Sequence, residues 1–200
     1  MIRAIIIDLD GTTLPRGWNS LSEENKKALE EAGRAGITRV LATGRSVFSF
    51  RNALPEGLPI DYMVFSSGAG IMHWNDQRLL CTRELSPEET LDIATMLWEY
   101  DINFTIQQPI PDNHHFLYRN TSPLHEDFRR RVENYPGLGT SIQSTRDIRS
   151  GATQFLVILD SKQLQLHGEI QEKLSGYSVI RSTSPIDNQA IWTEIFARDV

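Results

Sequence analysis

The chain has 200 residues, of which 40% are apolar and 23% charged, and this composition excludes disordered and low-complexity proteins. Twenty Lys and Arg against 26 Asp and Glu leave a net charge of -6, which argues against nucleic acid as a partner because phosphate binding needs a positive surface. The one cysteine, Cys81, cannot form an internal disulfide. Without a long apolar run or a signal-peptide pattern, the sequence predicts a soluble, cytoplasmic protein with no membrane partner.

The first third of the chain alternates predicted strands and helices. A β-branched run that ends at Asp8 predicts a buried strand, and the capping-box pattern Ser20-Leu21-Ser22-Glu23 predicts a helix start. Predicted strands cover residues 4–7, 37–42 and 61–65. One predicted helix follows Ser20, and a second covers residues 46–53 and ends before Pro55. This strand and helix order predicts right-handed crossovers and a parallel sheet.

The pattern changes near Leu79 to Thr82. The segment Ser86-Pro87-Glu88-Glu89 is a capping box with proline at the first helical position. One helix is predicted to begin at this capping box, and two more at about 124–133 and at 164–174. Strands are predicted at 102–107, 115–119, 153–159, 177–182 and 190–196. This second region is typical of a separate α+β unit.

Three predicted strands deliver small polar turns to one edge of the sheet. These turns are Asp8-Leu9-Asp10-Gly11-Thr12, Thr43-Gly44-Arg45 and Ser66-Ser67-Gly68-Ala69-Gly70. Ligands of open parallel sheets bind beyond the carboxyl ends of the strands. Carboxylates, hydroxyls and backbone N–H groups that meet there suit a divalent cation and a phosphate.

The spacing of Asp8 and Asp10 fits phosphoryl transfer. One carboxylate can attack phosphorus, and the other can protonate the leaving oxygen and later deprotonate water. Magnesium would offset the repulsion between carboxylate and phosphate, and Gly11 would let the chain turn away tightly. The alternative for these residues is ordinary turn and helix-cap chemistry.

These motifs resemble those of the haloacid dehalogenase-like (HAD) phosphatases. Asp8-Leu9-Asp10-Gly11-Thr12 resembles the first signature of that family, and Ala42-Thr43-Gly44-Arg45 resembles the second, in the form used by the Cof-type branch. Ser67-Gly68-Ala69-Gly70 is similar to the Asn-Gly-Ala segment of that branch, with Ser67 in place of the Asn.

The resemblance implies a role for each residue. Asp8 would be the nucleophile and a magnesium ligand, and Asp10 the general acid/base, ligating magnesium through its backbone carbonyl. Leu9 would donate its N–H to the phosphate. Thr43 and the Gly44 amide would hold the phosphoryl group. Arg45, Ser67 and Gly68 are candidate substrate contacts.

The resemblance also implies an α/β fold with a parallel Rossmann-like core sheet and an inserted α+β cap domain. Residues 1–81 would be the N-terminal part of the core, and residues 82–200 the cap and the start of the return to the core. The family places a Lys and an acidic metal-binding loop after the cap; the chain stops where these would begin, and Asp187-Asn188 does not match that loop. The core sheet is therefore expected to be incomplete, with an unpaired edge at residues 4–7 that a second copy of the chain could cover.

Three functions remain open at this point. The first is a magnesium-dependent phosphohydrolase of small phosphorylated metabolites such as sugar phosphates, a substrate class that rests on family analogy. The second is a phosphate-ligand binder that lacks the Lys and the acidic loop and does not turn over. The third is a signalling module that is phosphorylated on Asp8.

Overall fold

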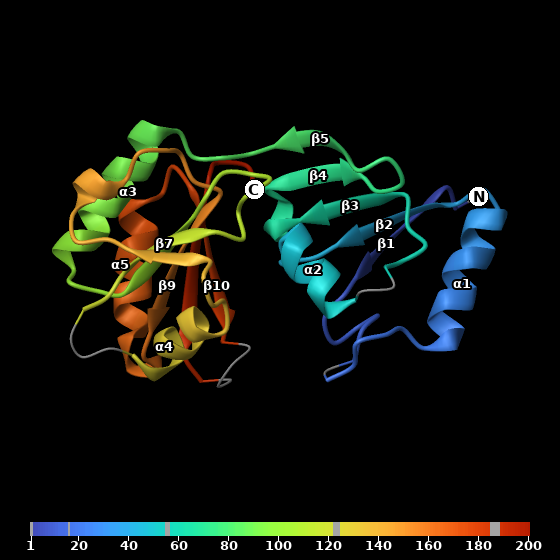
Figure 1. Ribbon diagram of the computed structural model, residues 1–200, viewed down its shortest axis with the longest axis horizontal. Helices are drawn as coiled ribbons and strands as arrows, with labels where there is room; N and C mark the ends of the chain where they lie inside the picture. Colours follow the sequence, from blue (N-terminus) through green and yellow to red (C-terminus); the bar gives the residue numbers. More distant parts are fainter. Residues whose placement is uncertain (1, 16, 55–56, 122–124, 185–188) are drawn as a thin grey trace. The chain divides into compact units, whose positions relative to one another are not determined.

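The computed structural model describes residues 2–15, 17–54, 57–121, 125–184 and 189–200. The predicted features at Pro55, Leu124 and Asp187-Asn188 lie outside this part. The chain forms two compact units, Met1–Thr82 and Arg83–Val200, which are described one at a time (Figure 1). No helix of the described residues is long and apolar enough to cross a membrane.

Unit 1, residues 1–82, is a mixed sheet with two helices. Its elements are β1 Ala4–Asp8, α1 Glu23–Arg34, β2 Thr38–Ala42, α2 Val47–Ala53, β3 Tyr62–Phe65, a single 3₁₀ turn Ser66–Gly68, β4 Gly70–His73 and β5 Arg78–Thr82. The strand order is β1-β2-β3-β4-β5. The pairs β1–β2 and β2–β3 are parallel, so the predicted parallel sheet is confirmed, while β3–β4 and β4–β5 are antiparallel.

The helices of unit 1 begin at serine caps. The Ser22 hydroxyl accepts a hydrogen bond from the Asn25 N–H, and the Ser46 hydroxyl accepts one from the Ser49 N–H. The predicted start at Ser20 is therefore two residues early: Glu23 is the first helical residue, so it cannot serve as the third position of a box that starts at Ser20.

The two faces of the unit 1 sheet differ in burial. Arg39 of β2 donates to the Leu29 carbonyl of α1 at 3.3 Å, so α1 covers the face that carries Arg39. Ile6 is the register partner of Val40, which puts its side chain on the opposite face, where it is 74% exposed. β1 is also the end strand of this sheet in the described part of the chain.

Unit 2, residues 83–200, is built on a six-stranded sheet. Its elements are α3 Pro87–Glu99, β6 Phe104–Gln107, β7 Phe116–Arg119, α4 Glu126–Glu133, β8 Gly139–Ser141, β9 Gln154–Leu159, α5 Leu164–Lys173, β10 Ser178–Thr183 and β11 Ile191–Phe196, with 3₁₀ turns at Thr145–Asp147 and Ser161–Gln163. The strand order is β10-β11-β9-β6-β7-β8. The capping box predicted at Ser86 and Glu89 is present.

Side chains of β9 alternate between two apolar clusters. Phe155 and Val157 belong to a cluster shared with α3 and α5. Leu156 belongs to a smaller cluster with Phe128 of α4. Because neighbouring residues of a strand face opposite sides, α3 and α5 cover one face of the sheet and α4 packs on the other.

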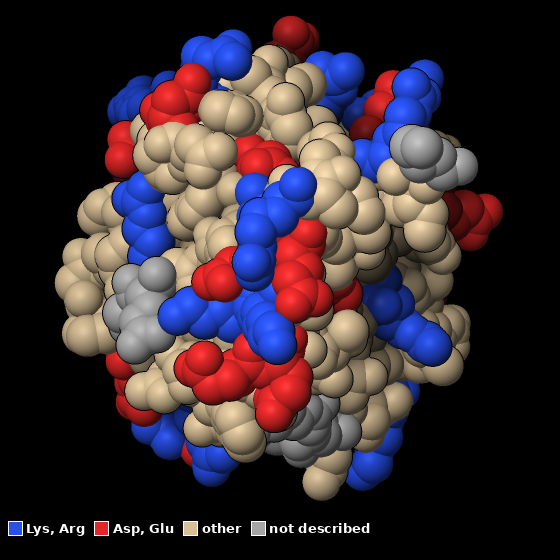
Figure 2. All heavy atoms as spheres, turned by 90° about the vertical axis from the view of Figure 1, so that its right-hand side faces the viewer, with Lys and Arg blue, Asp and Glu red and all other residues tan. Residues whose placement is uncertain are grey.

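Charged side chains of both signs are mixed on the surface. On the face drawn in Figure 2, Lys and Arg lie next to Asp and Glu rather than in a patch of one sign. Along α1, Lys27 lies 4.0 Å from Glu31, and Arg34 lies 4.0 Å from Glu30. Such exposed pairs contribute at most about 1 kcal/mol each to stability.

Candidate active site

The carboxyl ends of the three parallel strands lie level with one another. The register pairs Asp8 with Ala42 and Ala42 with Val64. The loops that carry Asp10, Thr43 and Ser67 therefore leave the sheet side by side at one edge.

The loop after β1 is closed by its own backbone and by two threonines. The N–H groups of Thr12 and Leu14 donate to the Leu9 carbonyl at 3.3 and 2.8 Å, and Gly11 N–H donates to the Leu14 carbonyl at 2.9 Å. Gly11 has a φ of +76°, the left-handed conformation that a tight turn needs. The Leu9 side chain is fully buried and anchors the loop, while Asp8 and Asp10 are exposed.

Two hydroxyl groups orient Asp8. Thr12 Oγ1 donates to Asp8 Oδ2 at 3.3 Å, and Thr13 Oγ1 donates to the Asp8 carbonyl at 2.5 Å. Asn25 of α1 donates in turn to the Thr13 carbonyl at 3.2 Å. Thr13 and Asn25 have no predicted role from the sequence. Only the position of Thr13 directly after the motif pointed to it.

Asp10 is held by Arg45. Arg45 Nη2 donates to Asp10 Oδ1 at 2.7 Å, and Arg45 Nε donates to Oδ1 and Oδ2 at 3.1 and 2.9 Å. From its place in the second motif Arg45 is a candidate substrate contact, but in this structure its guanidinium faces the expected acid/base, Asp10. The far end of the guanidinium, Nη1, lies 3.4 Å from Ser49 Oγ.

The second and third loops are joined by main-chain bonds. Thr43 Oγ1 accepts from Arg45 N–H at 3.2 Å, so the Thr43 hydroxyl proton points elsewhere. Ser66 N–H donates to the Arg45 carbonyl at 2.9 Å, and Ser67 N–H donates to the Thr43 carbonyl at 3.2 Å. A Cβ on Gly44 would lie 3.5 Å from Ser67 Oγ, so this glycine and Ser67 are neighbours.

The third loop follows an unusual backbone path. Ser66, Ser67 and Gly68 have φ values of +49°, +57° and +110°. Left-handed serines are rare and cost about 1–2 kcal/mol each, and the two main-chain bonds from Ser66 and Ser67 hold them there.

The oxygen atoms of the loop after β1 supply part of the ligand set that a hard divalent cation needs. The exposed Asp8 carboxylate and the Asp10 carbonyl belong to one short loop, and magnesium commonly takes one or two protein carboxylates and keeps several waters. Among the described residues, no group of three His, Cys, Asp or Glu side chains could hold a metal ion.

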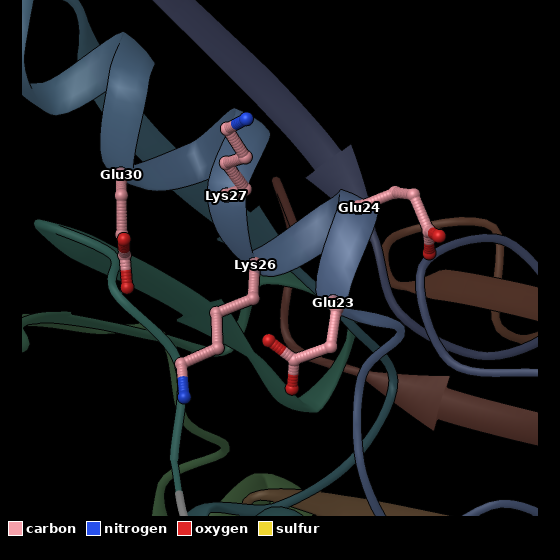
Figure 3. Close-up of a pocket in the computed structure, with 5 residues that line it drawn as sticks. All are labelled: Glu23, Glu24, Lys26, Lys27 and Glu30. Atoms are coloured by element: carbon pink, nitrogen blue, oxygen red, sulfur yellow. The ribbon is translucent and has the colours of Figure 1, made fainter.

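The five residues Glu23, Glu24, Lys26, Lys27 and Glu30 line a separate hollow on unit 1. All five are exposed, and Figure 3 shows that they come from successive turns of α1 and fan out around it. The hollow has no converging polar groups and is not a candidate site.

Comparison with known proteins identifies the family. A sequence model of haloacid dehalogenase-like hydrolases matches residues 5–191. The chain belongs to this family. The family predicted from the first two signatures is thus confirmed.

Relatives with phosphatase names share parts of this HAD-family chain. The 5-amino-6-(5-phospho-D-ribitylamino)uracil phosphatase YwtE of Bacillus subtilis is 30% identical over 105 residues, which cover 52% of this chain and 35% of YwtE. The B. subtilis phosphatase YcsE, named for the same activity, is 28% identical over 143 residues, covering 66% of this chain and 56% of YcsE. The chain thus spans about a third to a little over half of these relatives.

Solved structures share the fold. The HAD-superfamily phosphatase BT1666 from Bacteroides thetaiotaomicron has a TM-score of 0.75 at 19% identity, covering 100% of this chain and 68% of BT1666. The HAD subclass IIB sugar phosphatase BT4131 has a TM-score of 0.69 at 15% identity, covering 99% of this chain and 71% of BT4131. The α/β fold with a Rossmann-like sheet is therefore shown.

Proposed function

We propose that this HAD-family chain is a magnesium-dependent phosphohydrolase of small phosphorylated metabolites. The observation that carries the proposal is the meeting of Asp8, Asp10, Thr43 and Arg45 at the carboxyl edge of parallel strands, in a chain of this family. Unit 1 would be the catalytic core and unit 2 the cap. The names of the sugar phosphatase and ribitylaminouracil phosphatase relatives support sugar-phosphate-like substrates.

The exposed Asp8 carboxylate would attack phosphorus while the bond from phosphorus to the leaving oxygen breaks. Asp10 would give its proton to that oxygen, so that a neutral alcohol leaves and an aspartyl phosphate remains. Asp10 would then take a proton from water, whose oxygen attacks phosphorus and releases phosphate and Asp8. Such acid/base assistance contributes about 10²- to 10⁴-fold to rate.

Other residues of the site would bind the phosphoryl group. The Thr43 hydroxyl, which accepts from Arg45 N–H, has its proton to donate. The Gly44 and Leu9 amides would add N–H donors, and Ser67 and Gly68 would line the site from the third loop. The Asp8 carboxylate and the Asp10 carbonyl would hold magnesium, which supplies positive charge against the phosphate.

Hydrolysis of p-nitrophenyl phosphate with and without magnesium tests the proposal. The Asp8→Asn variant should lose at least about 10³-fold in kcat, since a carboxamide is a poor nucleophile. Asp92→Asn is the matched control, because Asp92 is an exposed residue of α3. Full activity in Asp8→Asn would refute the nucleophile assignment.

A second candidate is a phosphate-ligand binder without turnover. The observation that favours it is that, among the described residues, no three His, Cys, Asp or Glu side chains are grouped so that they could hold a metal ion. It predicts that phosphate binds with equal affinity with and without magnesium, measured by calorimetry, and that a folded wild-type chain releases no p-nitrophenol.

A further inference from the structure

The Arg45–Asp10 ion pair is too exposed to contribute much to the stability of the fold. The side chains are 31% and 50% exposed, and an ion pair of this kind contributes about 0–1 kcal/mol. Its geometry is nevertheless specific, because both Asp10 oxygens accept hydrogen bonds from one planar guanidinium edge. Such two-point contact fixes the direction of a carboxylate as well as its place.

The guanidinium is itself held from several sides. Its Nη1 approaches the Ser49 carbonyl and hydroxyl of α2 at 3.5 and 3.4 Å. The Arg45 backbone is fixed by its N–H to Thr43 Oγ1 and by its carbonyl, which accepts from Ser66 N–H. One residue therefore connects all three loops of the candidate site.

We propose that Arg45 is a positioning residue for Asp10. It orients the Asp10 carboxylate with its side chain and the Thr43 hydroxyl with its backbone N–H, so that the two groups keep a fixed relation to the phosphoryl site. This inference rests on the proposed phosphohydrolase function and replaces the expected substrate contact at Arg45. It follows that the arginine acts on the reaction through Asp10 and makes little contribution to substrate affinity.

Two phosphate esters separate these roles. The alcohol leaving from glycerol phosphate needs a proton, whereas dinitrophenolate, which leaves from 2,4-dinitrophenyl phosphate, does not. Loss of a positioned acid therefore lowers kcat/KM, which reports the step that releases the alcohol, only for the first ester, while loss of a substrate contact lowers kcat/KM for both. The variants are Arg45→Met, Arg45→Lys, Asp10→Asn and the double variant of Arg45→Met with Asp10→Asn. Arg51→Met is the control, because Arg51 is an exposed arginine of α2, the helix that follows Arg45.

For Arg45→Met we expect kcat/KM on glycerol phosphate to fall about 10- to 100-fold, part of the 10²- to 10⁴-fold that general acid catalysis supplies. On 2,4-dinitrophenyl phosphate kcat/KM should change little, while kcat falls if attack of water on the aspartyl phosphate, which also uses Asp10, limits turnover. Arg45→Lys should restore only part of the loss, because an ammonium group cannot make the two-point contact. The double variant should be no slower than Asp10→Asn alone, the non-additivity expected of residues that act as one. Arg51→Met should match the wild type.

Solution NMR provides a readout that does not depend on turnover. The Nε–H resonance of Arg45 should shift in Asp10→Asn and stay unchanged in Asp92→Asn. An equal fall of kcat/KM for both esters, an additive double variant or an Nε–H signal indifferent to Asp10→Asn would each overturn the inference while leaving the phosphohydrolase proposal intact. If the wild type hydrolyses neither ester, the phosphohydrolase proposal is refuted, and the positioning role with it.

Discussion

Replacing Gly70 with alanine should destabilise unit 1, because the added methyl group has no space. Gly70 is the register partner of Phe65. A Cβ at Gly70 would lie 2.1 Å from Cζ and 2.5 Å from Cε2 of the Phe65 ring, and this ring is 1% exposed. Overpacking of a dense core costs about 1–3 kcal/mol. We expect the upper part of that range, about 2–3 kcal/mol in the free energy of unfolding.

A second substitution tests whether Phe65 is the cause. Phe65→Leu alone should cost about 1–2 kcal/mol through lost packing. In that background Gly70→Ala should cost less than about 1 kcal/mol, so the coupling energy between the two sites is at least about 1 kcal/mol. Gly168→Ala is the matched control: a Cβ there meets nothing within 4 Å. Since Gly168 lies inside α5, alanine should stabilise unit 2 by about 0.5–1 kcal/mol.

Urea titrations followed by hydrogen exchange and mass spectrometry can measure both effects, because peptides from residues 1–82 and 83–200 report each unit separately. The expected signature is faster exchange in unit 1 for Gly70→Ala and slower exchange in unit 2 for Gly168→Ala. A cost below about 0.5 kcal/mol for Gly70→Ala, or the same cost with Leu at position 65, would refute the clash.

Three further outcomes are expected. Burial raises the pKa of Glu194, although Ser182 and Gln154 donate hydrogen bonds to it. The free energy of unfolding therefore falls as the pH rises above the ordinary pKa of a glutamate. Glu194→Gln should stabilise unit 2 at pH 7.5 and not at about pH 4, and an equal gain at both pH values in urea titrations would contradict this. The hydrogen bond from Arg39 lowers the pKa of Asp61, so Asp61 stabilises unit 1 at neutral pH and this contribution is lost as the pH falls below about 4; an acid midpoint by circular dichroism that is unchanged in Asp61→Asn would count against it. Ser67→Val should cost about 1–2 kcal/mol because of the left-handed backbone at that position, whereas Ser67→Asn should cost less than about 0.5 kcal/mol; equal melting temperatures would show that the loop is not strained.

The sequence predicted the elements whose side chains alternate against a core. The strand at residues 153–159 is an example: β9 alternates between two apolar clusters. The hairpin of β4 and β5 was missed because its pattern is weak. Arg78 to Leu80 of β5 are exposed, and a register shift between Ile71 and Met72 breaks the two-residue period. β8, Gly139–Ser141, is too short to show any period.

The loops of the candidate site could be predicted because each follows an apolar parallel strand. Their mutual contacts could not. The bond from Arg45 to Asp10 spans 35 positions in the chain and depends on a side-chain rotamer, which no local pattern specifies. The same holds for the Asn25 amide that reaches the Thr13 carbonyl from α1.

The division of the chain has a consequence for its synthesis. Among the described residues, every ladder of the unit 1 sheet pairs residues between Ala4 and Thr82, so these five strands can pair with one another before unit 2 is made. Because chains fold from the N-terminus as they leave the ribosome, this sheet can assemble while residues 83–200 are still being translated. In the described part of the chain β1 is the end strand of this sheet and Ile6 is exposed, so both are accessible from the time the sheet forms. The nascent chain should therefore be a substrate for chaperones that recognise short apolar segments.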